Sequence, residues 1–208
     1  MDFSRPLSVV APTLDGDVLG VLAGADDEFT GRRIHQVLGR GSEAGVRKAA
    51  DRLVGQGIVS RRQAGQAKLY SLNRDHLAAP YVVGLRSLKA QLVERLERAV
   101  AEWEAPPEAL FLFGSVARGE ATAESDLDLF VLRPTVIKGG TEVWEEQLSK
   151  LERDATVWTG NEARVVEYRH LDLKDLEVRR IAREALMEGI AIAGTRARLS
   201  ALMRKYEP

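Results

Sequence analysis

Residues 109–132 constrain the fold most, because they combine two short apolar runs with a tight turn and two closely spaced acids. The first run, Ala109–Phe113, has the continuous apolar character of a buried strand. It ends on Gly114-Ser115, where the backbone can turn sharply and bring its N–H groups close to an anion. The next residues begin a short predicted helix, so Ser115 is expected near a helix N-terminus, which suits phosphate.

Asp126 and Asp128 stand at alternate positions at the start of the second run, Leu127–Leu132. Side chains two residues apart on a strand point to the same face, about 6–7 Å apart along it. Two carboxylates on one face repel each other unless a cation lies between them. Hard divalent ions that bind phosphates prefer such ligands, so the pattern predicts a cation site beside the turn.

The order Gly114-Ser115, Ala117-Arg118-Gly119 and Ser125-Asp126-x-Asp128-Leu129 resembles the signature of the DNA polymerase β-like nucleotidyltransferases, in their small prokaryotic form. Weaker likeness continues to the Glu-Gly-Ile-x-Ile-x-Gly sequence at Glu188–Gly194. The resemblance implies binding of an NTP, with ATP as the expected nucleotide, and transfer of its NMP to a hydroxyl. The alternative is a hairpin whose acids are merely solvated.

The resemblance also implies roles for individual residues, with Mg²⁺ as cofactor in a two-metal site. The residues expected to bind nucleotide are Gly114, Ser115 and Arg118. The residues expected to be catalytic and to bind metal are Asp126, Asp128 and Glu167. For Arg118, a structural salt bridge is the alternative.

The third carboxylate depends on the register of the strand expected at residues 164–168. Glu167 is the only acid in this strand and shares a face with Val165, whereas Arg164, Val166 and Tyr168 share the other. In one register Glu167 completes the set. In the other, Arg164 or Val166 lies at the site and the metal set is incomplete, which affects turnover more than nucleotide binding.

Three helices and a hairpin are expected in the N-terminal part of the chain. Apolar residues recur at helical spacing from Leu14, and Thr30 and Ser42 can cap the second and third helices. Two strand-like runs flank Gly65. This order resembles the winged helix-turn-helix of bacterial transcriptional regulators, in which residues 42–56 would be the recognition helix in the major groove.

Basic residues gather in this part. Residues 31–74 contain ten Lys/Arg and two acids, whereas the whole chain has a net charge of −1. A basic module joined to an acidic one is typical of nucleic-acid binding, here to double-stranded DNA. The expected DNA-contact residues are Ser42, Arg47, Lys48, Arg52, Arg61, Arg62 and Lys68. A protein-interaction module, or a basic face that serves solubility, is the alternative.

The 208 residues exceed one typical domain. Apolar residues from Val82 to Val100 at spacings of three and four predict one long amphipathic helix that ends before Pro106-Pro107. We expect an α+β protein with a winged helix-turn-helix domain at 1–76, a linker helix at 77–106 and a nucleotidyltransferase domain at 107–208. The last would be a mixed sheet with helices on one face. The linker helix could pair with its copy in a homodimer, or pack on its own domain.

No apolar run is long enough to cross a bilayer, and the N-terminus has no signal-peptide pattern. The chain has no cysteine, which fits a cytoplasmic protein without disulfides. The leading hypothesis is a Mg²⁺-dependent nucleotidyltransferase with a hydroxyl acceptor on a partner protein, as in antitoxin-like members, coupled to a DNA-binding regulatory domain. The alternative is a non-catalytic transcriptional regulator whose nucleotidyltransferase-like domain only binds nucleotide or a partner protein.

Overall fold

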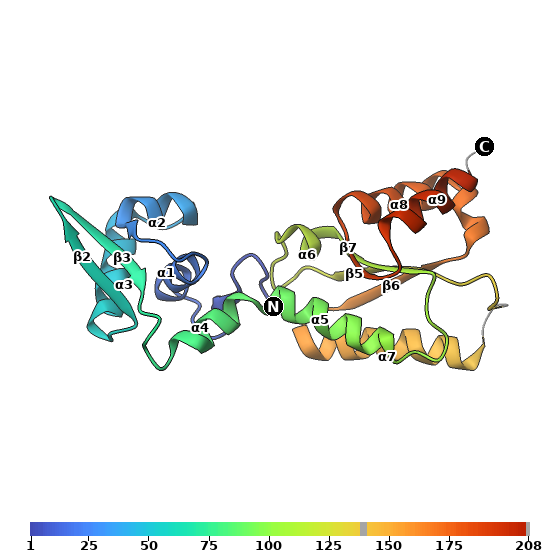
Figure 1. Cartoon of the computed structure of the whole chain (residues 1–208), viewed down its shortest axis with the longest axis horizontal. Helices are drawn as coiled ribbons and strands as arrows, with labels where there is room; N and C mark the ends of the chain where they lie inside the picture. The colour runs from blue at the N-terminus through green and yellow to red at the C-terminus, as the bar shows by residue number, and fades with distance from the viewer. Residues whose placement is uncertain (138–140, 207–208) are drawn as a thin grey trace. The chain divides into compact units, whose positions relative to one another are not determined.

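The computed structural model describes residues 1–137 and 141–206. The chain divides into two compact units (Figure 1). The N-terminal unit comprises Asp2 and residues 4–88, and the C-terminal unit comprises Met1, Phe3 and residues 89–208. The division falls between Leu88 and Lys89, inside the segment predicted as a linker helix.

The N-terminal unit contains helices and a small antiparallel sheet with strand order β1-β3-β2. Its elements are η1 (Pro6–Val9), α1 (Leu14–Ala23), β1 (Phe29–Thr30), α2 (Gly31–Leu38), α3 (Glu43–Gly55), β2 (Val59–Ala64), β3 (Ala67–Leu72) and α4 (Ala79–Arg86). The predicted helices and the hairpin around Gly65 are thus present.

Local sequence explains the helix starts in this unit. The Thr30 side chain accepts a hydrogen bond from the backbone N–H of Arg33, and Ser42 accepts one from Gly45, so both act as the N-caps that the sequence predicts. The apolar faces of α1, α2 and α3 meet in one core with the inner face of β3. Its fully buried residues include Val18, Leu22, Ile34, Val46 and Tyr70.

The single long helix predicted across residues 77–106 is two helices, α4 and α5 (Leu88–Ala101), interrupted at Ser87. The Ser87 hydroxyl donates to the carbonyl of Gly84 at 2.9 Å, a local bond that competes with a continuous helix. The apolar residues between Val82 and Val100 also belong to two separate cores. Val82 packs in the N-terminal unit, whereas Leu92, Leu96 and Val100 are buried in the C-terminal unit. These α5 side chains are therefore not free to pair with a copy of the chain.

The C-terminal unit is built on a four-stranded sheet with order β6-β5-β4-β7. Strands β5 and β6 are parallel, and the other neighbours are antiparallel. After α5 the elements are β4 (Ala109–Phe113), α6 (Gly114–Arg118), β5 (Leu127–Leu132), α7 (Glu142–Thr159), β6 (Ala163–Tyr168), η2 (His170–Lys174), α8 (Leu176–Glu188), β7 (Ile190–Ala193) and α9 (Arg196–Lys205).

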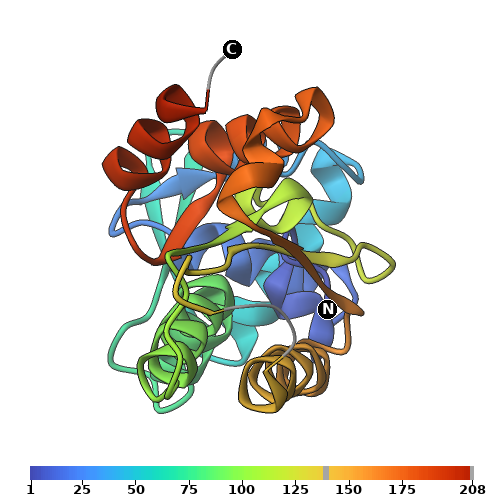
Figure 2. The same cartoon turned by 90° about the vertical axis from the view of Figure 1, so that its right-hand side faces the viewer.

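Helices cover both faces of this sheet, which corrects the prediction of helices on one face (Figure 2). Leu110 and Leu112 of β4 pack with α5 and α7, whereas Phe111 and Phe113 pack with α8 and α9. All residues of β4 are apolar, and so are all residues of β5 except Asp128. Both faces of these strands must therefore be buried. Among the described helices, none is both long and apolar enough to cross a membrane.

Candidate active site

The turn at Gly114 connects β4 directly to α6. Gly114 has φ +71°, a backbone conformation that favours glycine. A Cβ added at this position would lie 2.7 Å from Oδ2 of Asp128. Glycine is therefore required for two reasons, the positive φ and the close approach of the Asp128 carboxylate to the backbone of the turn.

Asp128 reaches the turn because β4 and β5 pair in antiparallel register, with Phe113 opposite Asp128. Asp126 precedes β5 by one residue, and its side chain is 34 % exposed. Partial burial raises the pKa of Asp128, and the nearby charge of Asp126 raises it further. The structure thus places Asp128 beside the glycine turn and Asp126 close to Asp128.

Arg164 of β6 is the neighbour of Asp128 in the parallel pairing of β5 and β6. One of its terminal nitrogens lies 2.7 Å from Oδ2 of Asp126. Its positive charge lowers the pKa of Asp128, against the larger effects of burial and of Asp126. An arginine therefore supplies the counter-charge that two adjacent carboxylates require.

Glu167 lies on the other face of the sheet. It pairs in register with Val131, whose side chain packs in the core formed with α5 and α7. Its carboxylate accepts a hydrogen bond from the Trp144 indole at 2.8 Å, and its Oε1 lies 3.0 Å from Nε of Arg133. Glu167 therefore cannot join Asp126 and Asp128 in one site, and its predicted role is corrected: the register places Arg164 there.

Ser115 and Arg118 belong to α6, which ends at Gly119. Ser115 is half-buried at the second position of this short helix, next to the turn. Arg118 instead contacts acids of its own unit, with Glu120 at 2.8 Å, Glu188 at 2.9 Å and Glu184 at 3.6 Å. This is the structural salt bridge that the sequence left open as the alternative for Arg118.

Glu184 of α8 is a residue of this region that sequence reasoning missed. Its charge also raises the pKa of Asp128, so α8 adds negative charge to the site. Its position in a helix far along the chain gave no spacing signal. In residues 1–137 and 141–206, no group of three or more His, Cys, Asp or Glu side chains is arranged to hold a metal ion.

The predicted DNA-contact residues lie on α3 and on the β2–β3 hairpin or cap α3, but most contact nearby acids. Arg52 is bidentate to Asp15 at 3.0 and 2.7 Å. The other ion pairs are Arg47 with Glu43, Arg61 and Lys68 with Asp51, and Arg62 with Glu28. Lys48 is exposed and has no ion pair within the described ranges.

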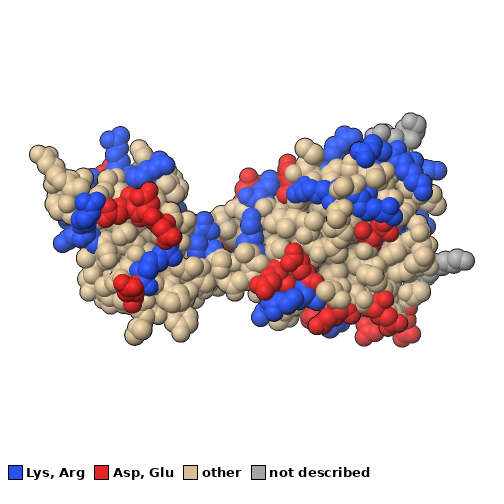
Figure 3. Space-filling view, in the orientation of Figure 1, with Lys and Arg blue, Asp and Glu red and all other residues tan. Residues whose placement is uncertain are grey.

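Acids of the N-terminal unit therefore offset much of the positive charge of these basic residues. The N-terminal unit contains twelve Lys/Arg and nine Asp/Glu, a net of +3. Figure 3 shows basic and acidic side chains interspersed on the visible face of this unit. The basic character predicted from residues 31–74 is thus largely offset by acids contributed from outside that segment.

Part of the C-terminal unit is similar to a known protein family. Residues 93–187 match the family model described as Nucleotidyltransferase domain. The matched range contains β4, the glycine turn, β5 and β6, and therefore all the residues that surround Asp128 in the sheet. We refer to this part of the chain as the nucleotidyltransferase domain. No curated protein matches the chain.

Three solved structures are similar to part of the chain. A toxin–antitoxin with AMP-PNP has 16% sequence identity and a TM-score of 0.38, covering 56% of this chain and 82% of that one. Two mutants of the toxin–antitoxin MntA–HpeT have 12% and 17% identity and TM-scores of 0.39 and 0.37. They cover 55% and 56% of this chain, and 82% and 81% of their own chains.

Proposed function

We propose that the nucleotidyltransferase domain binds an NTP, with ATP as the expected nucleotide, and transfers its NMP to a hydroxyl acceptor. The observation that carries this proposal is the contact of the Asp128 carboxylate with the Gly114 turn. It would bring a cation bound by the carboxylate and a phosphate bound by the turn to one place. In the reaction, the acceptor hydroxyl loses its proton and bonds to the α-phosphorus as the bond to pyrophosphate breaks.

Asp126 and Asp128 fit a divalent cation. They are adjacent carboxylates, one of them partly buried, and the pKa of Asp128 is raised by burial and by Asp126. A hard cation with oxygen ligands would relieve this repulsion. Bound Mg²⁺ would neutralise charge on the phosphates of the nucleotide. The backbone at Gly114 and the N–H and hydroxyl groups of Ser115 would donate to phosphate oxygens.

A second candidate function is nucleotide binding without transfer, in a non-catalytic regulator. Arg164 favours it, because it stands beside Asp128 where a third carboxylate would be needed for two metal ions. Its ion pair with Asp126 at 2.7 Å also competes with a cation for that carboxylate. The two candidates differ only in turnover, since both require the turn and the two aspartates.

The test measures transfer and binding separately on the full chain. With Mg²⁺ and ATP labelled at the α-phosphate, we expect label on the hydroxyl of a co-encoded partner protein, and its loss in Asp128→Asn. Glu124→Gln is a matched control, since this exposed acid lies in the loop before Asp126. Nucleotide binding by calorimetry without any label transfer would select the regulator. Absence of Mg²⁺-dependent nucleotide binding would refute both candidates.

We further propose that the N-terminal unit binds double-stranded DNA as a winged helix, with α3 as the recognition helix. The supporting observation is its element order, helix–strand–helix–helix–hairpin with a three-stranded sheet. Lys48, exposed on α3 without an ion pair among the described residues, would contact phosphate directly. The arginines that form ion pairs with acids of this unit would have to break those ion pairs before they could contact DNA phosphates.

The salt dependence of DNA affinity tests this assignment. Each phosphate contact contributes close to one unit of slope in log affinity against log salt, so Lys48→Gln should reduce the slope by about 1. Lys150→Gln is the control, because this exposed lysine lies on α7 of the other unit. An unchanged slope in Lys48→Gln would remove α3 from the DNA interface.

A further inference from the structure

The N-terminal unit contains a hollow of about 370 Å³ that no part of the proposed function uses. It lies between η1, α1, the end of α2 and the end of α4. This volume is within the range of pockets that hold small organic molecules. All of its lining residues belong to the N-terminal unit, so the hollow is complete within one compact body.

Two glycines of α1 and the glycine at its C-cap line the hollow. Gly16, Gly20 and Gly24 are spaced four residues apart and all line it. Gly16 is required by packing, because a Cβ there would lie 2.1 Å from the carbonyl oxygen of Ala11. At Gly20 the nearest atom to an added Cβ is Leu7 Cδ1 at 3.7 Å, an ordinary contact. Packing therefore does not require glycine at position 20. Glycine inside a helix is about 1 kcal/mol less favourable for helix stability than alanine.

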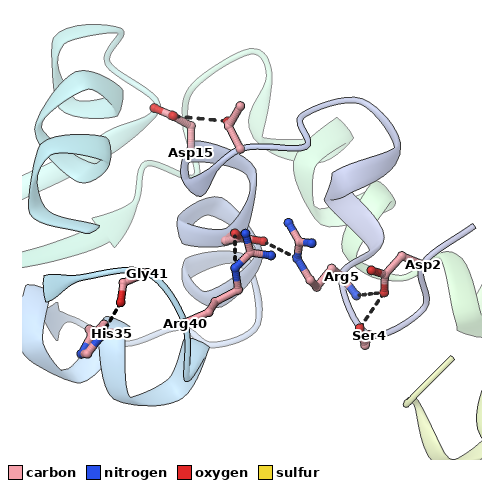
Figure 4. Close-up of polar contacts among 9 residues, drawn as sticks. Asp2, Ser4, Arg5, Asp15, His35, Arg40 and Gly41 are labelled. Atoms are coloured by element: carbon pink, nitrogen blue, oxygen red, sulfur yellow. Dashed lines mark hydrogen bonds and ion pairs between the residues drawn. The ribbon is translucent and has the colours of Figure 1, made fainter. Parts of the chain in front are cut away.

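A buried carboxylate organises the polar side of the hollow. The side chain of Asp17 is only 3% exposed. Its Oδ1 accepts a hydrogen bond from Nε of Arg5 at 2.9 Å, while its Oδ2 has no hydrogen bond and lies 3.5 Å from Nε of Arg40. Figure 4 shows Arg5 and Arg40 approaching the same point from opposite sides. Asp17 thus holds two guanidinium groups at one place in the hollow.

The two arginines use only their Nε atoms in these contacts with Asp17. In the part of the chain that the structure describes, no acceptor is hydrogen-bonded to the terminal nitrogens of Arg5 or Arg40. Arg86 also lines the hollow and has no ion pair among the described residues. Where Arg5 and Arg40 meet at Asp17, two guanidinium groups and one carboxylate leave a net charge of +1, which suits one monoanionic group.

The rest of the lining is apolar. Val21, Phe29, Val37 and Leu38 line the hollow together with Leu7. Val37 is 52% exposed, although apolar side chains of an amphipathic helix such as α2 usually face the core. A molecule with an anionic group and an apolar body would therefore satisfy both sides. A monoanion matches the net charge of +1 at Arg5, Arg40 and Asp17, whereas a phosphate dianion exceeds it.

From this arrangement we propose that the hollow binds a small organic carboxylate. The terminal nitrogens of Arg5 and Arg40 hold the carboxylate, and an aromatic or branched aliphatic body packs on Val21 and Val37. Arg40 stands between the end of α2 and Ser42, the N-cap of α3. A bound carboxylate therefore acts directly on the turn that connects these two helices.

Calorimetry of the full chain with benzoate, 1-naphthoate and indole-3-acetate tests the proposal. We expect at least one to bind with a Kd below about 1 mM. Benzyl alcohol, 1-naphthalenemethanol and phenyl phosphate should bind at least tenfold more weakly. Arg40→Gln should weaken carboxylate binding about tenfold, and Gly20→Leu should abolish it by filling the hollow.

Two matched variants separate these effects from changes in folding. Arg33→Gln removes an exposed arginine of α2 that does not line the hollow, and Gly55→Leu adds the same side chain where an added Cβ has no atom within 4 Å. Both should keep the parent affinity. Binding by none of the three carboxylates, equal binding of the neutral alcohols, preferential binding of phenyl phosphate, or undiminished binding to a folded Gly20→Leu would each overturn the proposal.

Discussion

Replacing Glu167 with glutamine separates the two possible roles of this residue. In the structure its carboxylate accepts a hydrogen bond from Trp144 at 2.8 Å and lies 3.0 Å from Nε of Arg133, on the face of the sheet opposite to Asp128. The side chains of Arg133 and Glu167 are 12% and 23% exposed. We expect Glu167→Gln to lower the stability of the C-terminal unit and to leave nucleotide affinity unchanged.

The size of the effect follows from these contacts. Hydrogen bonds to charged groups are worth about 1.5–3 kcal/mol net, and breaking a fully buried ion pair costs about 3–5 kcal/mol. Glutamine keeps a carbonyl that can accept from Trp144, and both charged side chains are partly exposed, so the loss should be near the low end, about 1–2 kcal/mol. With a urea m-value of about 1.5 kcal/mol/M, the unfolding midpoint should fall by about 1 M.

Tryptophan fluorescence isolates the relevant transition, because Trp103, Trp144 and Trp158 all lie in the C-terminal unit. Urea unfolding is followed by fluorescence, and binding of Mg²⁺ with ATP by calorimetry. Glu145→Gln, an exposed acid of α7, is the control and should change neither quantity. A tenfold loss of nucleotide affinity in Glu167→Gln at an unchanged midpoint would refute the role derived from the register.

Three further predictions concern the turn and its acids. Arg164→Asp places a carboxylate beside Asp128 and removes a competing cation, so Mg²⁺ should bind at least about tenfold more tightly in a titration followed by calorimetry; unchanged affinity would contradict the charge argument. Gly114→Ala should abolish nucleotide binding and lower the free energy of unfolding in urea by about 1–3 kcal/mol. Gly160 has nearly the same φ, but a Cβ added there has no atom within 4 Å, so Gly160→Ala should lower the free energy of unfolding only by the backbone strain. Equal losses in the two variants would exclude the clash with Asp128. Because the pKa of Asp128 is raised in the folded state, its contribution to stability is present below the ordinary pKa of aspartate and is lost as pH rises through the raised value. Asp128→Asn should therefore raise the Tm of the protein without nucleotide at pH 7, and a Tm that falls would reverse the assigned sign.

Much of the local structure was predictable from the sequence. The strands expected at Ala109–Phe113 and Leu127–Leu132 have these bounds in the structure, and the caps expected at Thr30 and Ser42 are formed. Strand alternation also predicted that Asp126 and Asp128 would lie close together, and the charge of Asp126 acts on Asp128 in the structure. In each case the signal lies within a few residues, where apolar runs, glycine and capping side chains act directly.

Other expectations depended on partners far away in the sequence. The linker segment was expected to be one helix, yet its apolar residues pack into two different cores. The arginines of α3 and the hairpin looked available for DNA, yet Arg52 contacts Asp15 and Arg62 contacts Glu28. A count of charges along one segment cannot include acids that only folding brings close.

The amino-acid sequence by itself determined the glycine turn and the aspartate pair, because bond geometry and strand alternation act between near neighbours. Only the tertiary structure decided what stands next to them. Parallel pairing of β5 and β6 puts Arg164 beside Asp128 and turns Glu167 to the other face, where Trp144 and Arg133 contact it. A strand has a repeat of two residues, so a shift of one residue in register exchanges the faces, and that register is set by packing across the whole sheet.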